Sequence, residues 1–187
     1  MPTFDITMRT LYNILALLML CCGAVACAVM DDNPLPSYEK TTIVRVGDMA
    51  PDFTVRTLAG NDVSLSDYQG KTLLLVFFSS GCKDCHAQLD VLDAVAARFA
   101  DKNFDILAVS RGEDRQTTEQ FVTSRGYGFT VALDPEKLAY NLYATQYVPR
   151  CFVIDPLGHI LALSVEYNEE EFALLTEIIE DNTSDKE

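Results

Sequence analysis

Basic side chains are scarce in this chain of 187 residues, in which 14 lysine and arginine residues stand against 28 aspartate and glutamate residues. The formal net charge is therefore −14. Because binding to nucleic acid requires a basic surface that neutralises phosphates, this charge excludes nucleic acid as an expected partner. Much of the acid lies between residues 166 and 187, where we interpret it as a solvated face that keeps the protein soluble.

Tryptophan, internal repeats and, apart from the acidic end, low-complexity segments are also absent. The six cysteines do not form the disulfide framework of a small secreted scaffold, because such a framework spreads an even set through the fold. Three of them lie in an apolar stretch near the N-terminus, two lie close together in the middle of the chain, and Cys151 stands alone. The length suits one domain with its own core and a short additional segment.

Residues 11–30 contain no charged side chain, and an apolar stretch of about 20 residues is just long enough to span a bilayer. Arg9 precedes this stretch, which favours a cytoplasmic N-terminus. Small residues come before Cys27 in a pattern similar to a bacterial lipoprotein box, which predicts Cys27 as the lipidated first residue of the mature protein. An uncleaved N-terminal anchor and an ordinary cleaved signal are the alternatives. All three predict an extracytoplasmic location in the cell envelope, and the first two also tether the protein to the membrane.

The composition predicts four segments along the chain. Residues 1–26 form a signal or anchor segment, and residues 27–45, with two prolines and several polar side chains, form an extended tether. A folded domain follows over residues 46–181, and residues 182–187 form an acidic tail.

Cys82 and Cys85 lie two residues apart, directly after a continuous apolar run and at the start of a predicted helix. A helix N-terminus carries partial positive charge and free backbone N–H groups, so it stabilises a thiolate and makes it a usable nucleophile at neutral pH. The second cysteine follows one turn later, where it can close a short disulfide. Strand, Cys-x-x-Cys and helix together predict a dithiol/disulfide redox site.

Hydrophobic periodicity predicts an α/β domain around this motif. Alternating residues predict an N-terminal β-hairpin, and the apolar run before Cys82 is typical of a central strand covered on both faces. A tight turn at 155–158 predicts a second hairpin. The expected strands are 50–55, 62–65, 72–78, 104–109, 129–133, 151–154 and 159–165, and the expected helices are the segment after Cys82 that ends near Phe99, 117–125, 136–143 and 172–179.

Several short motifs occur in order along residues 46–180. They are Gly47–Phe53, Leu65–Lys71, Cys82–Cys85, Val148–Pro149, and Val153–Asp155 with Gly158. With this ordered set the chain resembles the membrane-tethered thioredoxin-like family of the TlpA/ResA type, within the wider alkyl hydroperoxide reductase/thiol-specific antioxidant (AhpC/TSA) group. The resemblance implies a thioredoxin-like α/β fold over the domain at 46–181, with a central mixed β-sheet flanked by helices and an N-terminal β-hairpin extension.

The same resemblance implies roles for individual residues. Cys82 is expected to be the exposed nucleophile and Cys85 the buried resolving thiol. Pro149 is expected to form a cis peptide bond facing the disulfide, with Val148 offering backbone groups to a substrate strand; an ordinary trans-proline at a strand edge is the alternative. The implied function is a thiol–disulfide oxidoreductase that reduces disulfides of partner proteins, is re-reduced by an upstream membrane electron donor and needs no cofactor.

The chain departs from the family pattern at two positions. Gly81 stands directly before the first cysteine, where the family usually has tryptophan, so the site is expected to be less shielded and to contact substrate differently. Val76 stands where thioredoxins carry a buried acid, so proton transfer to and from Cys85 must use another group or water. Asp84 is the candidate, and the alternative for Asp84 is a solvated acid at a helix N-terminus.

Charged neighbours are expected to tune the thiols. Lys83 favours a thiolate by its charge, whereas Asp84 opposes it. His86 follows Cys82 by one helical turn, so as an imidazolium it would stabilise the thiolate; an exposed histidine without a role is equally compatible. Cys151 follows Pro149 by two residues and is either a third redox thiol or, as we favour, a small buried core residue.

Three other chemistries fit parts of the pattern. Cys82–His86 matches the attachment motif for c-type haem, with His159 or Met49 as distant axial ligands. A thiol peroxidase of the peroxiredoxin type would use a hydroxyl such as that of Ser79, although Leu75 stands where its proline belongs. A copper or zinc carrier would bind metal through Cys82, Cys85 and either His86 or Cys151.

Overall fold

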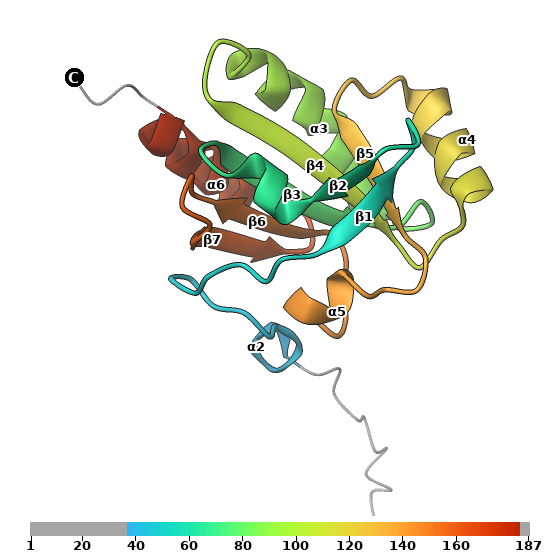
Figure 1. Cartoon of the computed structure of the whole chain (residues 1–187), viewed down its shortest axis with the longest axis horizontal. Coiled ribbons are helices and arrows are strands. Elements are labelled where there is room, and N and C mark those ends of the chain that lie inside the picture. Colours follow the sequence, from blue (N-terminus) through green and yellow to red (C-terminus); the bar gives the residue numbers. More distant parts are fainter. Residues whose placement is uncertain (1–36, 184–187) are drawn as a thin grey trace, which may run out of the picture. The chain divides into compact units, whose positions relative to one another are not determined.

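The computed structural model describes residues 37–183, which form a seven-stranded sheet with helices on both faces (Figure 1). The strand order is β2-β1-β5-β4-β3-β6-β7. Central β3 pairs parallel with β4 and antiparallel with β6, so the sheet is mixed, as the family resemblance implied. The strands are β1 (Thr54–Thr57), β2 (Asp62–Ser64), β3 (Thr72–Phe78), β4 (Phe104–Arg111), β5 (Thr130–Asp134), β6 (Arg150–Ile154) and β7 (Ile160–Val165).

Strand β3 is buried along its whole length because both faces of the sheet are covered. Successive side chains of a strand point to opposite faces. Leu73, Leu75 and Phe77 therefore enter one hydrophobic cluster, while Leu74 and its alternate neighbours enter the other. Each such side chain contributes about 1.5–3 kcal/mol on burial. The strand ends at Phe78, so the loop that carries Cys82 leaves a firmly held part of the core.

Three helices pack on one face of the sheet: α3 (Lys83–Arg98), α4 (Arg115–Arg125) and α6 (Glu169–Thr183). Helix α3 buries Leu89 and Leu92 against the sheet, in agreement with the predicted apolar stripe. Helix α4 ends at Gly126, whose φ of 74° is the left-handed conformation that glycine adopts without penalty.

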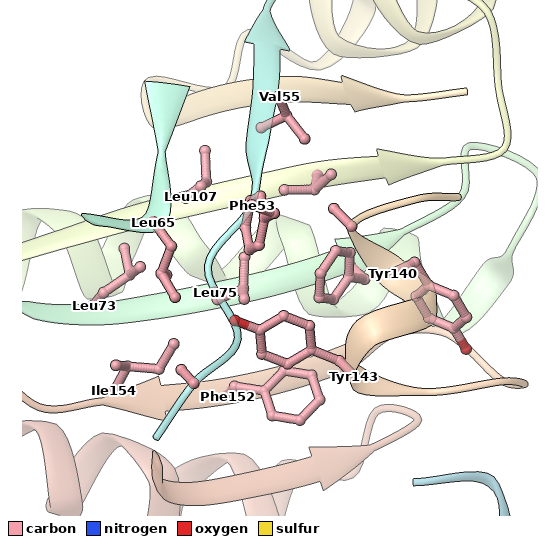
Figure 2. Packing of buried hydrophobic residues seen from close by; sticks show 14 of the residues in the cluster. Phe53, Val55, Leu65, Leu73, Leu75, Leu107, Tyr140, Tyr143, Phe152 and Ile154 are labelled. Atoms are coloured by element: carbon pink, nitrogen blue, oxygen red, sulfur yellow. The ribbon is translucent and has the colours of Figure 1, made fainter. Parts of the chain in front are cut away.

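The opposite face carries an aromatic cluster, shown in Figure 2. Tyr143 comes from the short helix α5 (Tyr140–Tyr143) and packs with Phe53 and Phe152, with ring centroids 5.9 Å and 5.0 Å away. Its hydroxyl donates a hydrogen bond to the carbonyl of Pro51 at 2.7 Å. Aromatic pairs of this kind add about 0.5–1.5 kcal/mol beyond burial, so they fix the position of α5. The 3-10 helix η1 (Leu65–Tyr68) closes the same face through Leu65.

Three segments differ from the sequence-based expectation. The first strand, predicted at 50–55, is Thr54–Thr57. The helix predicted at 136–143 is shortened to Tyr140–Tyr143, because Lys137 has a φ of 60° and residues 134–137 form a turn. Residues 37–45, assigned to the tether by sequence, contain the one-turn helix α2 (Tyr38–Thr41) and bury Thr41 and Val44. Packed structure therefore begins before residue 46.

The predicted membrane-directed segment cannot be compared with the fold. The apolar stretch 11–30, including Cys27, lies outside the described residues, as do residues 184–187 of the predicted acidic tail. Within residues 37–183, none of the helices combines the length and apolar character needed to cross a bilayer.

Candidate active site

Cys82 is the N-cap residue of α3. Its sulfur accepts a hydrogen bond from the backbone N–H of Cys85 at 3.2 Å, and its thiol donates to the carbonyl of Val148 at 3.3 Å. The first N–H groups of a helix have no partner within the helix, and the helix dipole is positive there. Negative charge on the half-buried Cys82 sulfur is therefore stabilised, while the sulfur remains partly open to a reaction partner.

Cys85 lies one turn further along α3 and is fully buried. Burial raises the pKa of its thiol strongly, and the hydrogen bond with Cys82 raises it further, while a backbone hydrogen bond from Ser79 works in the opposite direction. The two thiols thus differ in the way that a nucleophile and a resolving thiol must differ. Cys82 is accessible to a substrate, whereas Cys85 is buried behind Cys82 and stays protonated more readily. Both are free thiols in the structure.

The third part of the site is the Pro149 loop (residues 144–149), which connects α5 to β6. The Val148–Pro149 peptide bond is cis, as the resemblance implied. Antiparallel pairing of β3 with β6 sets Phe77 opposite Arg150, so this loop and the loop that carries Cys82 lie at the same end of the two strands. Pro149 itself is buried, and the Val148 carbonyl faces the Cys82 sulfur.

Glu113, which sequence analysis did not single out, fastens the loop before Cys82. Its carboxylate accepts hydrogen bonds from the Ser79 hydroxyl at 2.9 Å, from the Ser80 hydroxyl at 2.8 Å and from the Ser80 backbone N–H at 2.9 and 3.0 Å. The Ser110 hydroxyl donates a further bond at 2.9 Å. Partial burial raises the pKa of Glu113, but these hydrogen bonds outweigh it, so the pKa lies below its ordinary value.

The position of Glu113 follows from the topology. It comes two residues after the end of β4, and β4 runs parallel to β3. The carboxyl ends of neighbouring parallel strands meet at one edge of the sheet, where sites form. The sequence did show an acidic residue just after an apolar strand. Assigning Glu113 to the site, however, requires knowing that β3 and β4 are neighbours in the sheet.

Ser79 links this anchor to both cysteines through its backbone. Its N–H is hydrogen-bonded to Cys85, and its carbonyl accepts the Cys82 N–H at 3.1 Å. Because Glu113 holds the Ser79 hydroxyl, the carboxylate fixes the backbone groups that contact the two thiols.

Lys83 and Asp84, the charged residues expected to tune the thiols, have no side-chain contact with either cysteine among the hydrogen bonds and ion pairs of the described residues. The side chains of Lys83 and Asp84 are exposed and make no hydrogen bond or ion pair with another described residue. Asp84 is therefore a solvated acid here, and its carboxylate makes no hydrogen bond to Cys85. A Cβ added to Gly81 would meet no atom within 4 Å, so the side of the site where the family usually has tryptophan is open.

His86 matches neither expectation for it. The ring is half-buried, stacks on Phe121 of α4 with centroids 4.9 Å apart, and has Nε2 2.6 Å from the Ser80 carbonyl. Nε2 must carry a proton to donate to that carbonyl, and Nδ1 then accepts from the Arg125 guanidinium at 3.4 Å. With this tautomer the ring helps to hold Ser80, and none of the hydrogen bonds of the described residues joins it to the Cys82 sulfur.

Cys151 is buried in the same hydrophobic cluster as Cys85. Burial raises the pKa of its thiol to about 12, while a hydrogen bond with Ser164 opposes the increase. On β6 it pairs with Val76 of β3. This environment agrees with the buried core residue that the sequence favoured.

The geometry does not support the three other chemistries. Met49 and His159 are bridged to each other beside the 155–158 turn, at the opposite end of β6 from the Pro149 loop, so neither lies near the Cys82 motif for haem. The Ser79 hydroxyl points to Glu113, not to a peroxide site at Cys82. Within residues 37–183, no three His, Cys, Asp or Glu side chains are grouped to bind a metal.

Comparison with known proteins decides the family. The model of the AhpC/TSA family matches residues 46–163. The chain belongs to this family. Thiol-disulfide oxidoreductase ResA of Geobacillus kaustophilus is 32% identical over 123 residues, which are 66% of this chain and 71% of that protein. ResA of Bacillus thuringiensis is 28% identical over 82% of this chain and 86% of its own length.

Solved structures give the same assignment. A candidate protein disulfide isomerase from Bacteroides thetaiotaomicron is 32% identical and aligns with a TM-score of 0.73 over 76% of this chain and 92% of its own. A candidate thiol:disulfide interchange protein DsbE from Chlorobium tepidum is 30% identical, with a TM-score of 0.68 over 73% of this chain and 97% of its own. The fold is thioredoxin-like, and the protein is a thiol–disulfide oxidoreductase.

Proposed function

We propose that this AhpC/TSA family member reduces disulfides of partner proteins through a Cys82–Cys85 dithiol/disulfide couple. The Cys82 thiolate attacks one sulfur of the partner disulfide, forming a mixed disulfide and releasing one partner thiolate. Cys85 then loses its proton and attacks the Cys82 sulfur, which releases the second partner thiolate. The partner gains two electrons, and the protein is left with a Cys82–Cys85 disulfide.

The observation that carries this proposal is the asymmetry of the two thiols. Cys82 is half-buried, with its sulfur capping α3, whereas Cys85 is fully buried behind it and has a raised pKa. Rapid attack on a partner disulfide requires an accessible thiolate, and release of the partner from the mixed disulfide requires a second thiol within reach of the first. The Val148 carbonyl beside Cys82 offers a hydrogen-bond acceptor to the extended backbone of a substrate, and open space beside Gly81 admits it.

We further propose that the reaction takes place outside the cytoplasm, in the cell envelope. The apolar stretch at 11–30 and the lipoprotein-like residues before Cys27 support a lipoprotein or an N-terminal anchor, followed by a tether. An upstream electron donor in the membrane would then return two electrons to the Cys82–Cys85 disulfide. The charge of −14 supports protein partners and not nucleic acid.

A trapping experiment with the full chain in detergent micelles tests this function. The reduced Cys85→Ser variant is mixed with a peptide containing one internal disulfide, and adducts are mapped by mass spectrometry. We expect an adduct at Cys82 that accumulates in Cys85→Ser but resolves in the wild type. A peptide that is neither reduced by the wild type nor trapped by the variant would contradict the proposed function.

A further inference from the structure

The Pro149 loop is fastened to the first described residues of the chain, here called the N-terminal clamp (residues 38–43). The Ile43 N–H donates to the carbonyl of Tyr143, and the Thr145 N–H donates to the carbonyl of Thr41, both at 2.9 Å. Thr42 and Ala144 form an antiparallel bridge between these bonds. Helix α2 accordingly lies next to α5 in Figure 1. A short ladder of backbone bonds thus runs along the beginning of the loop.

Arg150 makes the second connection. Its side chain is 0% exposed, although it directly follows Pro149. Its guanidinium donates to the hydroxyls of Thr41, at 2.8 Å, and Thr42, and also to the carbonyl of Gln146 within the loop, at 2.8 and 3.2 Å. A buried cation is tolerated only when its donors are satisfied. The clamp hydroxyls are therefore part of what holds Arg150 against the loop.

Tyr38 makes the third connection, at the end of the loop nearest Cys82. Its ring packs edge to face on Tyr147, with centroids 5.1 Å apart at 89°. Its hydroxyl donates to the carboxylate of Glu166, whose own backbone N–H donates to the Pro149 carbonyl at 2.9 Å. From the other side, the Tyr140 hydroxyl donates to the Tyr147 carbonyl at 2.7 Å. Tyr147 and Pro149 are thus held on two sides.

The backbone at this point needs such support. Tyr147 and Glu166 have φ values of 67° and 62°, in the left-handed region that residues with a Cβ seldom adopt. A residue in a sparsely populated region costs about 1–3 kcal/mol and stays there only when its surroundings hold it. Tyr147 directly precedes Val148, so the contacts that fix Tyr147 also fix the direction of the Val148 carbonyl that faces Cys82.

We propose that the N-terminal clamp positions the Pro149 loop for peptide substrates, with Tyr38 and Arg150 as the positioning residues. The inference rests on the proposed function, because the Val148 carbonyl is needed only if an extended peptide pairs beside Cys82. A small disulfide without a peptide backbone does not use this carbonyl. The clamp therefore controls how well a peptide disulfide binds. The Cys82 thiol donates to the same carbonyl, but the attacking thiolate has no proton to donate, so its attack on a small disulfide does not use this bond.

Single-turnover rates of the reduced full chain in detergent micelles test the clamp. One probe is a peptide with one internal disulfide, and the other is dithiobis(nitrobenzoate), a small aryl disulfide. For Tyr38→Ala we expect the half-saturating peptide concentration to rise about tenfold, since small misplacements of positioning groups have effects of this order. The limiting peptide rate and the rate with the aryl disulfide should change less than about twofold. Tyr38→Phe, which keeps the ring contact but loses the bond to Glu166, should fall between Tyr38→Ala and the wild type.

Tyr68→Ala is the matched control. The Tyr68→Ala substitution removes a partly buried ring and its hydrogen bond with Thr130, but Tyr68 lies in η1, which precedes β3, at the opposite end of that strand from Cys82. It should lower the melting temperature without changing the half-saturating peptide concentration. If Tyr38→Ala does not fold, Tyr38→Phe takes its place, because it keeps the ring contact with Tyr147, and it should also raise the half-saturating peptide concentration selectively.

The possible outcomes separate the clamp from the function on which it rests. Equal losses with both disulfides, or no change with either, would overturn the clamp. A wild-type protein that reduces neither probe would instead refute the proposed function.

Discussion

Two loops flank Cys82, and they are held by opposite kinds of group. The loop before it, Ser79–Gly81, is held by the carboxylate of Glu113, which accepts bonds from serine hydroxyls and a backbone N–H. The Pro149 loop is held by a buried guanidinium, that of Arg150, and by the N-terminal clamp. The first loop contacts both cysteines through Ser79, whereas the second contacts only Cys82, through a carbonyl.

This difference indicates a division of labour in the site. Groups that hold Ser79–Gly81 set the position and the hydrogen bonds of the sulfur atoms, so they should affect every disulfide substrate. Groups that hold the Pro149 loop set the position of the Val148 carbonyl, which accepts a hydrogen bond from the protonated Cys82 thiol and which, among substrates, only a peptide uses. A small disulfide and a peptide disulfide therefore report on the two loops separately.

Removing the cysteines should have the largest effect, because both loops serve them. Cys82→Ser should lower the rate with either disulfide by at least about a thousandfold, since a hydroxyl is not ionised at neutral pH. Cys85→Ser should still react once, as a mixed disulfide at Cys82, and then stop. Substantial turnover by Cys82→Ser in a peptide-reduction assay would show that the reaction uses another thiol.

Substitution of Glu113 should sharpen the comparison. In Glu113→Gln one acceptor oxygen becomes an amide that cannot accept from the Ser80 N–H, so the Ser79–Gly81 loop should loosen. We expect the rates with both disulfides to fall together, by about tenfold for a loss of about 1.4 kcal/mol. Asp84→Asn removes the same charge from an exposed position and is the matched control. If only the rate with the peptide disulfide fell, Glu113 would act on peptide binding, as the Pro149 loop does, and not on the sulfur atoms.

Acid should weaken the first loop before the second. The pKa of Glu113 is lowered in the folded state, so its contribution to stability is present above its ordinary value of 4.5 and is lost as the pH falls through the folded pKa. Melting temperatures of the wild type and Glu113→Gln should therefore converge as the pH falls below about 4.5. A difference that stays constant over this range would show that the Glu113 charge does not stabilise the fold.

Cys151 should give the smallest effect, because it belongs to neither loop. Cys151→Ala removes one buried sulfur and should cost about 1 kcal/mol of stability. Rates with both disulfides should remain at wild-type values in the same single-turnover assay. A selective loss of reduction would show that Cys151 is a third redox thiol after all.

The cysteine motif could be predicted from the sequence, whereas the residues that hold the Pro149 loop could not. Strand β3, helix α3 and the cysteine motif could be predicted because each depends on residues that are close in sequence. The clamp could not, because Thr41 and Arg150 are separated by 109 positions and residues 27–45 have the polar, proline-containing composition of a linker. Helical spacing predicted that His86 faces Cys82, but Phe121 from α4, a helix packed nearby, stacks on the ring.

A redox titration of the full chain, with alkylation and mass mapping at each potential, tests the central claim most directly. The account predicts one reversible two-electron couple between Cys82 and Cys85, at or below about −230 mV, with Cys151 recovered as a free thiol throughout. A couple near about −120 mV would make the protein a disulfide donor and contradict the reductase direction. No reversible disulfide between Cys82 and Cys85 would contradict the dithiol mechanism itself.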